Sequence, residues 1–176
     1  AVPGVDTAGF TINMPMQGWS GDTAMQVVGR QNQPEPGYSV RYDGVAGDYF
    51  GALGIPLLRG RAFSRADNST NSPPVAVCSE ALARQVFPNE DPIGKYFRLG
   101  GERKYEIIGL VGDVKQTRLD DDRADRLYLP FVRGNGSLIV RTRVAPLSLA
   151  ELIRTAVLEV DADQPVSNVR TLEQDI

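Results

Sequence analysis

The sequence predicts an α+β domain in which short strands outnumber helices. Among its 176 residues are 18 Gly and 12 Pro, which favours many turns over a helical bundle. Apolar and polar residues alternate in several short segments, most clearly over 38–45, as they do in half-buried strands. The last third combines one strand pattern with one amphipathic helix pattern. A chain of this length suits one domain or two small subdomains with a sizeable core.

The first third contains three strand patterns and a short helix. Small or apolar residues recur over Val5–Met16, and loop-forming Gly and Pro surround the next short segment. Tyr49, Phe50 and Leu53 share the inner side of the helix at helical spacing. The expected elements are strands over 5–16, 25–29 and 38–45, followed by a helix over 48–53.

The middle third predicts a strand, a capped helix and a hairpin. Ser79 precedes the apolar helical positions and is a good N-cap, while Pro88 ends the helix. Gly100-Gly101 is the turn of the hairpin. The expected elements are a strand over 74–78, a helix over 79–88, hairpin strands over 95–99 and 104–114, and a strand over 126–131.

The last third predicts a strand–helix–strand unit. The strand covers 137–144, and Ser148 with Glu151 reads as a capping box at the start of the helix. After a turn at 162–165, a second strand is expected over 166–171, so the unit should close as a right-handed crossover on a sheet. The helix places an apolar stripe on one face: Leu149, Leu152, Ile153, Ala156, Val157 and Val160.

The segment 49–63 is apolar but ends with Arg59 and Arg61 around Gly60. Without a histidine, a carboxylate pair or phosphate-loop spacing nearby, we interpret it as scaffold with a tight corner. The guanidinium groups are expected to bind carbonyls or carboxylates such as Asp67. We predict that Gly60→Val or Leu58→Asp destabilises the domain more than Arg61→Ala.

Residues for acid–base, nucleophilic or metal chemistry are scarce. The sequence has no histidine, which removes the commonest general base and zinc ligand. Cys78 is the lone cysteine; it lies in an apolar run and is expected to be buried and inert. Ser20 in Gly-Trp-Ser-Gly lacks the glycine spacing of a nucleophile elbow. We therefore expect no enzyme activity and no catalytic, cofactor-binding or metal-binding residue, and no cofactor.

An acidic loop over 119–126 is the remaining metal candidate. Asp120, Asp121, Asp122 and Asp125 could supply carboxylate oxygens to a hard cation. Consecutive aspartates point in different directions, and the spacing of a calcium loop is missing, so a solvated loop balanced by neighbouring arginines is the better interpretation.

Charge and hydropathy restrict the partners. The formal net charge is −3 and the pI is near 5.0, so no nucleic-acid partner is expected. No stretch approaches the ~20 apolar residues of a membrane span. The chain begins without Met, and we expect it to be a piece of a longer protein.

Five segments, taken in order, resemble one family. They are GVAGDYFGALGIPLLRGRAFSRAD, PVAVCSEALARQVFPNEDPIGKYFRLGG, YEIIGLVGDVK, RLYLPF, and LIVRTRVAP with PVSNVRTLEQ. Together they resemble the periplasmic core domain of MacB/FtsX-type ABC transporter permeases, and most of all the version in the duplicated permeases of acidobacteria that lack an ATPase. The resemblance covers nearly the whole chain from about Asp6.

This resemblance implies two subdomains. A porter-like α/β sandwich subdomain would be built from both chain ends, approximately 1–45 and 114–176. A β-rich subdomain, approximately 46–113, would be inserted between them. The resemblance also implies membrane helices of the same permease on both sides of the domain, an ATPase subunit and a second permease half. A periplasmic adaptor or cell-wall protein is a further expected partner.

The implied function is non-catalytic. On the periplasmic side of the cytoplasmic membrane, the domain would couple cytoplasmic ATP hydrolysis to conformational change during export of an unknown substrate, which is called mechanotransmission. The alternative is an FtsX-like regulator that recruits or activates cell-wall enzymes. Two weaker hypotheses are a hydrolase using Ser20 and a sensor of small ligands.

Overall fold

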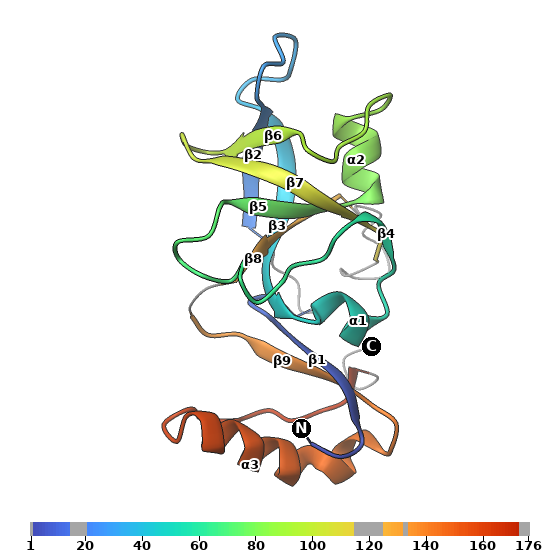
Figure 1. Ribbon diagram of the computed structural model, residues 1–176, viewed down its shortest axis with the longest axis vertical. Helices are drawn as coiled ribbons and strands as arrows, with labels where there is room; N and C mark the ends of the chain where they lie inside the picture. Colours follow the sequence, from blue (N-terminus) through green and yellow to red (C-terminus); the bar gives the residue numbers. More distant parts are fainter. Residues whose placement is uncertain (1, 15–20, 115–124, 132–133, 173–176) are drawn as a thin grey trace.

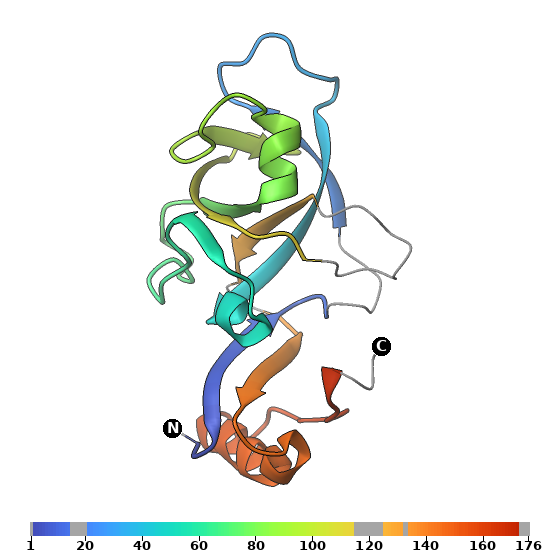
Figure 2. The ribbon, with the colours of Figure 1, turned by 90° about the vertical axis from the view of Figure 1, so that its right-hand side faces the viewer.

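The computed structural model describes residues 2–14, 21–114, 125–131 and 134–172. The molecule is elongated, with a strand-rich body at one end and the last helix at the other (Figure 1). Turning it by a quarter shows that the first and last described segments, coloured blue and red, lie toward the end that carries the last helix (Figure 2). The mixture of strands and helices confirms the α+β class.

Nine strands and three α-helices make up the described residues, together with one 3-10 helix. The strands are β1 (Val5–Thr11), β2 (Gly21–Val27), β3 (Tyr38–Gly47), β4 (Leu57–Gly60), β5 (Val75–Ser79), β6 (Tyr96–Leu99), β7 (Lys104–Val111), β8 (Arg126–Pro130) and β9 (Ser137–Thr142). The helices are α1 (Tyr49–Leu53), α2 (Glu80–Val86), the 3-10 helix η1 (Pro146–Leu149) and α3 (Ala150–Val160).

Six strands close into a barrel, in the order β2-β6-β7-β5-β8-β3, because β2 pairs with both β6 and β3. The β3–β8 and β5–β7 pairs are parallel, and the other neighbours in the ring are antiparallel. The short strand β4 pairs with β7 outside the ring. Full closure leaves the barrel strands without the open edges that promote aggregation.

The barrel interior is apolar and capped by α2. Met25, Val40, Phe97, Ile107 and Leu127 are fully buried and belong to one cluster with the inner residues of α2. Ser79 starts α2 as expected, because its hydroxyl accepts a hydrogen bond from the Leu82 amide at 3.2 Å. A sequestered cluster of this kind provides most of the free energy of folding.

A two-stranded ribbon, β1 with β9, extends from the barrel. The long strand β3 makes the connection: its first half pairs with β2, its middle with β8, and its last residues, 45–47, with β1. On the far side β1 pairs antiparallel with β9. The chain then enters η1 and α3, which lie below the ribbon (Figure 1).

Two expectations for the last third are wrong. Ser148 and Glu151 form no capping box: the Ser148 hydroxyl donates to the Ala145 carbonyl oxygen at 2.7 Å, and Glu151 instead pairs with Arg154. The helix starts later, after the 3-10 turn, at a residue without a side-chain cap. In addition, no strand follows α3 within residues 161–172, so the described part of the chain contains no strand–helix–strand crossover there.

The borders drawn near residues 46 and 113 stay a prediction. The barrel includes strands from both sides of each border, because β2, β3 and β8 close the same ring as β5, β6 and β7. Within the described residues, none of the helices is both long and apolar enough for a membrane span.

Candidate functional site

The candidate site is the joint between the barrel and the ribbon. We define the joint as α1, Asp48, the part of β1 from Thr7 to Gly9, and Arg141 of β9. Helix α1 follows β3 directly and packs against both β1 and β9. It is therefore the element through which the two halves of the molecule contact each other.

Asp48 fastens the start of α1 to the ribbon. One carboxylate oxygen accepts from the Gly51 amide at 3.1 Å, which caps the helix, and the other accepts from the Thr7 hydroxyl at 2.6 Å. The Asp48 amide donates to the Ala8 carbonyl oxygen at 2.9 Å. Hydrogen bonds to a carboxylate are among the stronger ones in proteins. One residue thus caps the helix and holds β1.

The ribbon approaches α1 at a glycine. A β-carbon on Gly9 would lie 2.3 Å from Cα of Tyr49 and 2.6 Å from its amide nitrogen. No side chain fits in that space, so the backbones of β1 and α1 are in direct contact. At the opposite end of α1, the Arg141 guanidinium donates from Nε to the Ala52 carbonyl oxygen at 3.1 Å.

Aromatic rings fill the space between α1 and the barrel wall. Tyr49 is fully buried, and the ring of Phe50 meets that of Tyr128 edge-on at 5.0 Å. Burial raises the pKa of the Tyr128 hydroxyl above its usual range. Ile139 of β9 belongs to the same cluster, so the apolar packing continues from the barrel into the ribbon.

A buried polar cluster supports the joint from the barrel side. Asp43 of β3 is fully buried and pairs with the Arg126 guanidinium of β8 at 2.5 Å. The other Asp43 oxygen accepts from the Asn13 side-chain amide, just after β1, at 2.8 Å. Removing one partner of such a pair leaves an uncompensated buried charge, which is strongly destabilising. Asn13, Asp43 and Arg126 therefore fix the position of the end of β1 against the barrel.

The residues that the sequence singled out for chemistry do not converge. Arg61 binds both oxygens of Asp67, at 2.7 and 3.1 Å, as expected, and Arg59 pairs with Asp91. Cys78 is buried, and burial raises the pKa of its thiol to about 12, as expected for an inert thiol.

The remaining candidates fall mostly outside the described residues. Ser20 and Asp120–Asp122 lie in the segments 15–20 and 115–124, which the structure does not describe, whereas Asp125 is buried. Across the described ranges, acidic and sulfur-bearing side chains form no group that could hold a metal ion.

Sequence reasoning missed the polar parts of the joint. In the alternation of β3, Asp43 falls on the polar side, yet it is fully buried. Its partners are distant in sequence, 30 residues for Asn13 and 83 for Arg126, so no local pattern reveals them. Asp48 could have been found, because an aspartate directly before a helical pattern is a strong N-cap signal.

Comparisons with known proteins give the chain a family. The family described as MacB-like periplasmic core domain matches residues 2–169. A macrolide export ATP-binding/permease protein MacB from Mannheimia succiniciproducens is 26% identical over 123 residues, which is 69% of this chain and 18% of the relative. The chain therefore spans less than a fifth of the length of that curated relative.

Two solved structures share the fold. The periplasmic region of MacB from Actinobacillus actinomycetemcomitans matches 90% of this chain and 68% of its own with a TM-score of 0.62 and 20% identity. The extracellular domain of the noncanonic ABC-type transporter YknZ from Gram-positive bacteria matches 93% of this chain and 80% of its own, with a TM-score of 0.60 and 15% identity. At these identities the likeness concerns the fold alone.

Proposed function

The chain belongs to the MacB-like periplasmic core domain family, and from this premise we propose that it is the non-catalytic, extracytoplasmic coupling domain of an ABC transporter permease. In this role it transmits movements, driven by ATP hydrolysis in the cytoplasm, to its own distal barrel during export of a substrate. The partners we propose are the membrane helices of the same permease, an ATPase subunit and a second permease half, with a periplasmic adaptor as a further candidate. The domain would lie on the periplasmic side of the cytoplasmic membrane.

The observation that carries this proposal is the construction of the joint. Force can pass from the chain ends to the barrel only if the ribbon and the barrel move together. The direct contact of Gly9 with Tyr49, the bonds of Asp48 and Thr7, and the continuous apolar cluster all oppose a hinge at this point. Closely packed interiors have low compressibility and transmit strain.

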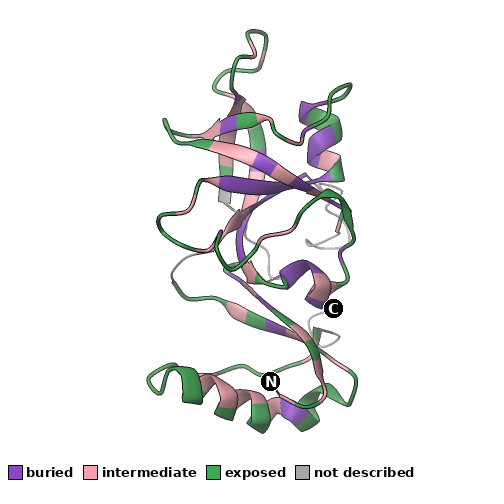
Figure 3. Cartoon of the chain, viewed as in Figure 1, coloured by how far each residue is buried: buried purple, intermediate pink, exposed green. Residues whose placement is uncertain are grey.

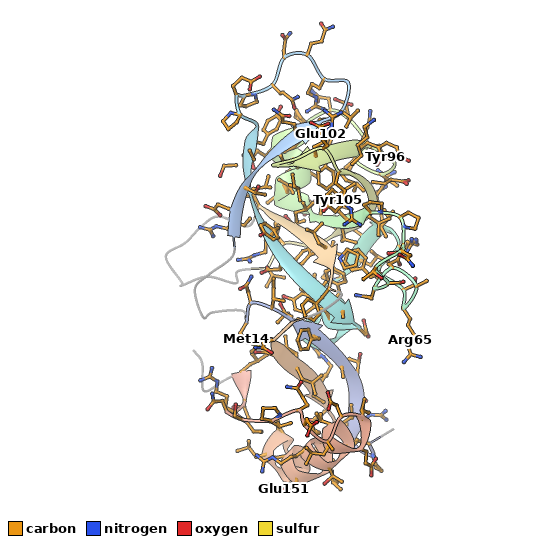
Figure 4. The ribbon with its side chains drawn as sticks, turned by 90° about the vertical axis from the view of Figure 1, so that its left-hand side faces the viewer. Met14, Arg65, Tyr96, Glu102, Tyr105 and Glu151 are labelled. Atoms are coloured by element: carbon orange, nitrogen blue, oxygen red, sulfur yellow. The ribbon has the colours of Figure 1, made fainter. Side chains whose placement is uncertain are left out.

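The proposal is tested by a distance measurement across the joint. Glu102 lies toward the barrel end of the molecule and Glu151 on α3 at the other end, and both are exposed (Figure 4). Spin labels on Glu102→Cys and Glu151→Cys in the full-length permease, assembled with its ATPase, report the distance between them. One unchanged distance with and without ATP is expected, while the distance between Glu102 labels on the two permease halves changes. Two populations of the Glu102–Glu151 distance whose proportions change with ATP would show a hinge within the domain and contradict the proposal.

A variant that weakens the joint provides a second test, with a control variant far from the joint. Thr7→Val with Arg141→Met removes the hydrogen bonds to Asp48 and Ala52 while leaving the apolar cluster intact. We expect a broader Glu102–Glu151 distance distribution and weaker coupling of ATP hydrolysis to export, with little change in the amount of folded protein. Arg103→Met, in the β6–β7 turn far from the joint, should leave both readouts unchanged.

The FtsX-like alternative makes a different prediction. A regulatory domain should capture a peptidoglycan hydrolase in a pull-down, and deletion of the gene should alter cell-wall turnover without loss of export. That pair of results would replace the coupling proposal.

A further inference from the structure

A small hollow, which we call the turn pocket, lies on the outer surface of the barrel beside the turn between β6 and β7. Its volume is about 270 Å³, and its polar lining residues are Gln26 of β2, Arg98 of β6 and Glu102 of the turn. Gln26 and Arg98 pair across the two strands. Their neighbours Met25 and Phe97 are fully buried in the core, so the alternation of side chains along a strand places Gln26 and Arg98 outside. The turn is exposed, whereas the middle of β7 is buried (green and purple in Figure 3).

The turn pocket stays open because its floor carries little side-chain bulk. The floor residues are Ala24, Gly100 and Gly101. Apart from its chain neighbours, the atom nearest to a β-carbon on Gly101 would be the Leu99 carbonyl oxygen, at 3.9 Å. The side-chain amide nitrogen of Gln26 donates to the carbonyl oxygen of Pro36, another lining residue, at 2.7 Å. This bond orients the amide group and leaves its Oε1 atom as an acceptor.

Two opposite charges line the turn pocket without binding each other. Among the described residues, neither Arg98 nor Glu102 takes part in an ion pair, and the buried Nε atom of Arg98 has no acceptor. By contrast, Arg59, Arg61 and Arg84 each bind an aspartate. A buried N–H group without an acceptor is destabilising. Because the charge of a guanidinium is delocalised and its planar fork matches a carboxylate, a carboxylate on the terminal nitrogens of Arg98 would compensate it.

We propose that the turn pocket binds a small zwitterion, a molecule with one carboxylate and one ammonium group, such as a free amino acid. The carboxylate accepts from the terminal nitrogens of Arg98, and the ammonium group donates to the Glu102 carboxylate and to Oε1 of Gln26. A simple anion would be repelled by Glu102 and a simple cation by Arg98, so the two charges together select a ligand that carries both.

The size and the place of the turn pocket restrict the ligand and separate this inference from the coupling function. A volume of about 270 Å³ is at the small end for ligand pockets, which favours a single amino acid over a peptide. Glu102 lies at the end of the molecule opposite Glu151, and the pocket shares no residue with the joint (Figure 4). The inference therefore stands or falls independently of the coupling function.

Calorimetric titration of the full-length permease in detergent with each standard amino acid tests the proposal. We expect at least one amino acid to bind saturably, with a Kd at or below about 1 mM. For that amino acid, the analogue without the amino group and the analogue without the carboxylate should each bind about tenfold more weakly or worse. The dipeptide of the same residue should also bind more weakly, because its two charges lie farther apart.

Charge variants locate the bound amino acid. Arg98→Gln and Glu102→Gln should each raise its Kd about tenfold or more. Glu102→Gln should also bind the analogue without the amino group at least as tightly as the wild type does, because the repulsion is removed. Arg103→Gln is the matched control, since Arg103 lies in the same turn but stacks on the Tyr105 ring at 5.5 Å and does not line the pocket. It should leave the Kd unchanged, and all three variants should keep the melting temperature of the ligand-free protein.

Each other result overturns the proposal. Absence of saturable binding up to about 10 mM for every amino acid would show that the turn pocket has no such ligand. Equal binding of the analogue without the amino group would show a simple anion site, and tighter binding of the dipeptide would show a peptide site. A Kd that neither Arg98→Gln nor Glu102→Gln changes would place the bound amino acid elsewhere on the permease.

Discussion

The barrel and the ribbon with α3 are made of similar apolar residues but bury them to different extents. Helix α2 places Leu82 against the barrel at 1% exposure, whereas α3 leaves Leu152 52% exposed. The barrel closes on itself through hydrogen bonds, and α2 completes its core. The ribbon has only two strands, and an isolated pair of strands is marginally stable in water.

The two regions therefore differ in how completely their apolar residues are covered. The barrel has a complete apolar core, while the ribbon and α3 form an incomplete layer whose apolar groove remains open.

The largest effect is expected from core truncation in the barrel. Leu82→Ala should reduce the free energy of unfolding by about 2–5 kcal/mol, because it removes a fully buried side chain and leaves a cavity. Leu152→Ala, the matched leucine on α3, should cost less than about 1 kcal/mol in the same chain. Urea unfolding of the purified domain measures both. Equal losses would show that α3 is as well packed as α2.

A comparable effect is expected at the corner after β4. Gly60 has φ +71°, and a β-carbon there would lie 2.2 Å from the Ile108 carbonyl oxygen. Gly60→Val should therefore cost about 3 kcal/mol or more, from backbone strain and from the clash. Gly94 has φ +78° but no atom within 4 Å of a β-carbon, so Gly94→Ala isolates the strain, about 1 kcal/mol. Similar thermal shifts for both variants would show that the clash is relieved by movement.

Neighbouring positions show how far the sequence could predict this corner. Gly60 has the positive φ of a tight corner. Leu58, however, is 44% exposed on β4, so Leu58→Asp should lower the free energy of unfolding only slightly. The apolar composition of the segment gave no indication that β4 lies outside the barrel. By contrast, the Arg61 guanidinium donates to both carboxylate oxygens of Asp67. Arg61→Ala should therefore lower the free energy of unfolding more than its surface position suggests.

Local elements were predictable because their signals are local. The helix start at Ser79 and the turn at Gly100-Gly101 depend on neighbouring residues only, and both are present. Closure of the barrel depends on β2 pairing with β6 across about 70 residues, and the joint depends on Asp43 and Arg126, 83 residues apart. The apolar stripe predicted for α3 lines an open groove. The predicted capping box does not form, and no strand follows α3 within residues 161–172.

The pair of Arg61 and Asp67 makes stability depend on pH. Hydrogen bonds from Arg61 hold the pKa of Asp67 below its usual value of 3.8. A lowered pKa stabilises the fold above the unfolded value, and the contribution is lost as the pH falls below about 4. Asp67→Asn should cost about 1 kcal/mol at pH 7.

Melting temperatures of the wild type and of Asp67→Asn at pH 7 and pH 3 measure the contribution of the Asp67 carboxylate to stability. The difference should shrink at the lower pH, because the Asp67 carboxylate of the unfolded chain takes up a proton there while that of the folded protein stays ionised. Asp91→Asn, in the exposed pair with Arg59, should change stability by less than about 0.5 kcal/mol at both pH values. A difference at Asp67 that stays constant with pH would contradict the assigned ion pair.

The smallest effect concerns reactivity rather than stability, and it compares the two regions with a single reagent. The Cys78 thiol in the barrel has a pKa raised to about 12 by burial, so at pH 8 only about one molecule in ten thousand carries the reactive thiolate. A cysteine at Leu152, exposed on α3, should ionise like a free thiol and react about a thousand times faster with a disulfide reagent. In urea, Cys78 should react at the same rate as the cysteine at position 152, because unfolding removes the burial that separates them. Equal rates in the folded domain would mean that the barrel opens as readily as α3, and the contrast between a closed barrel and an incomplete layer would then fail.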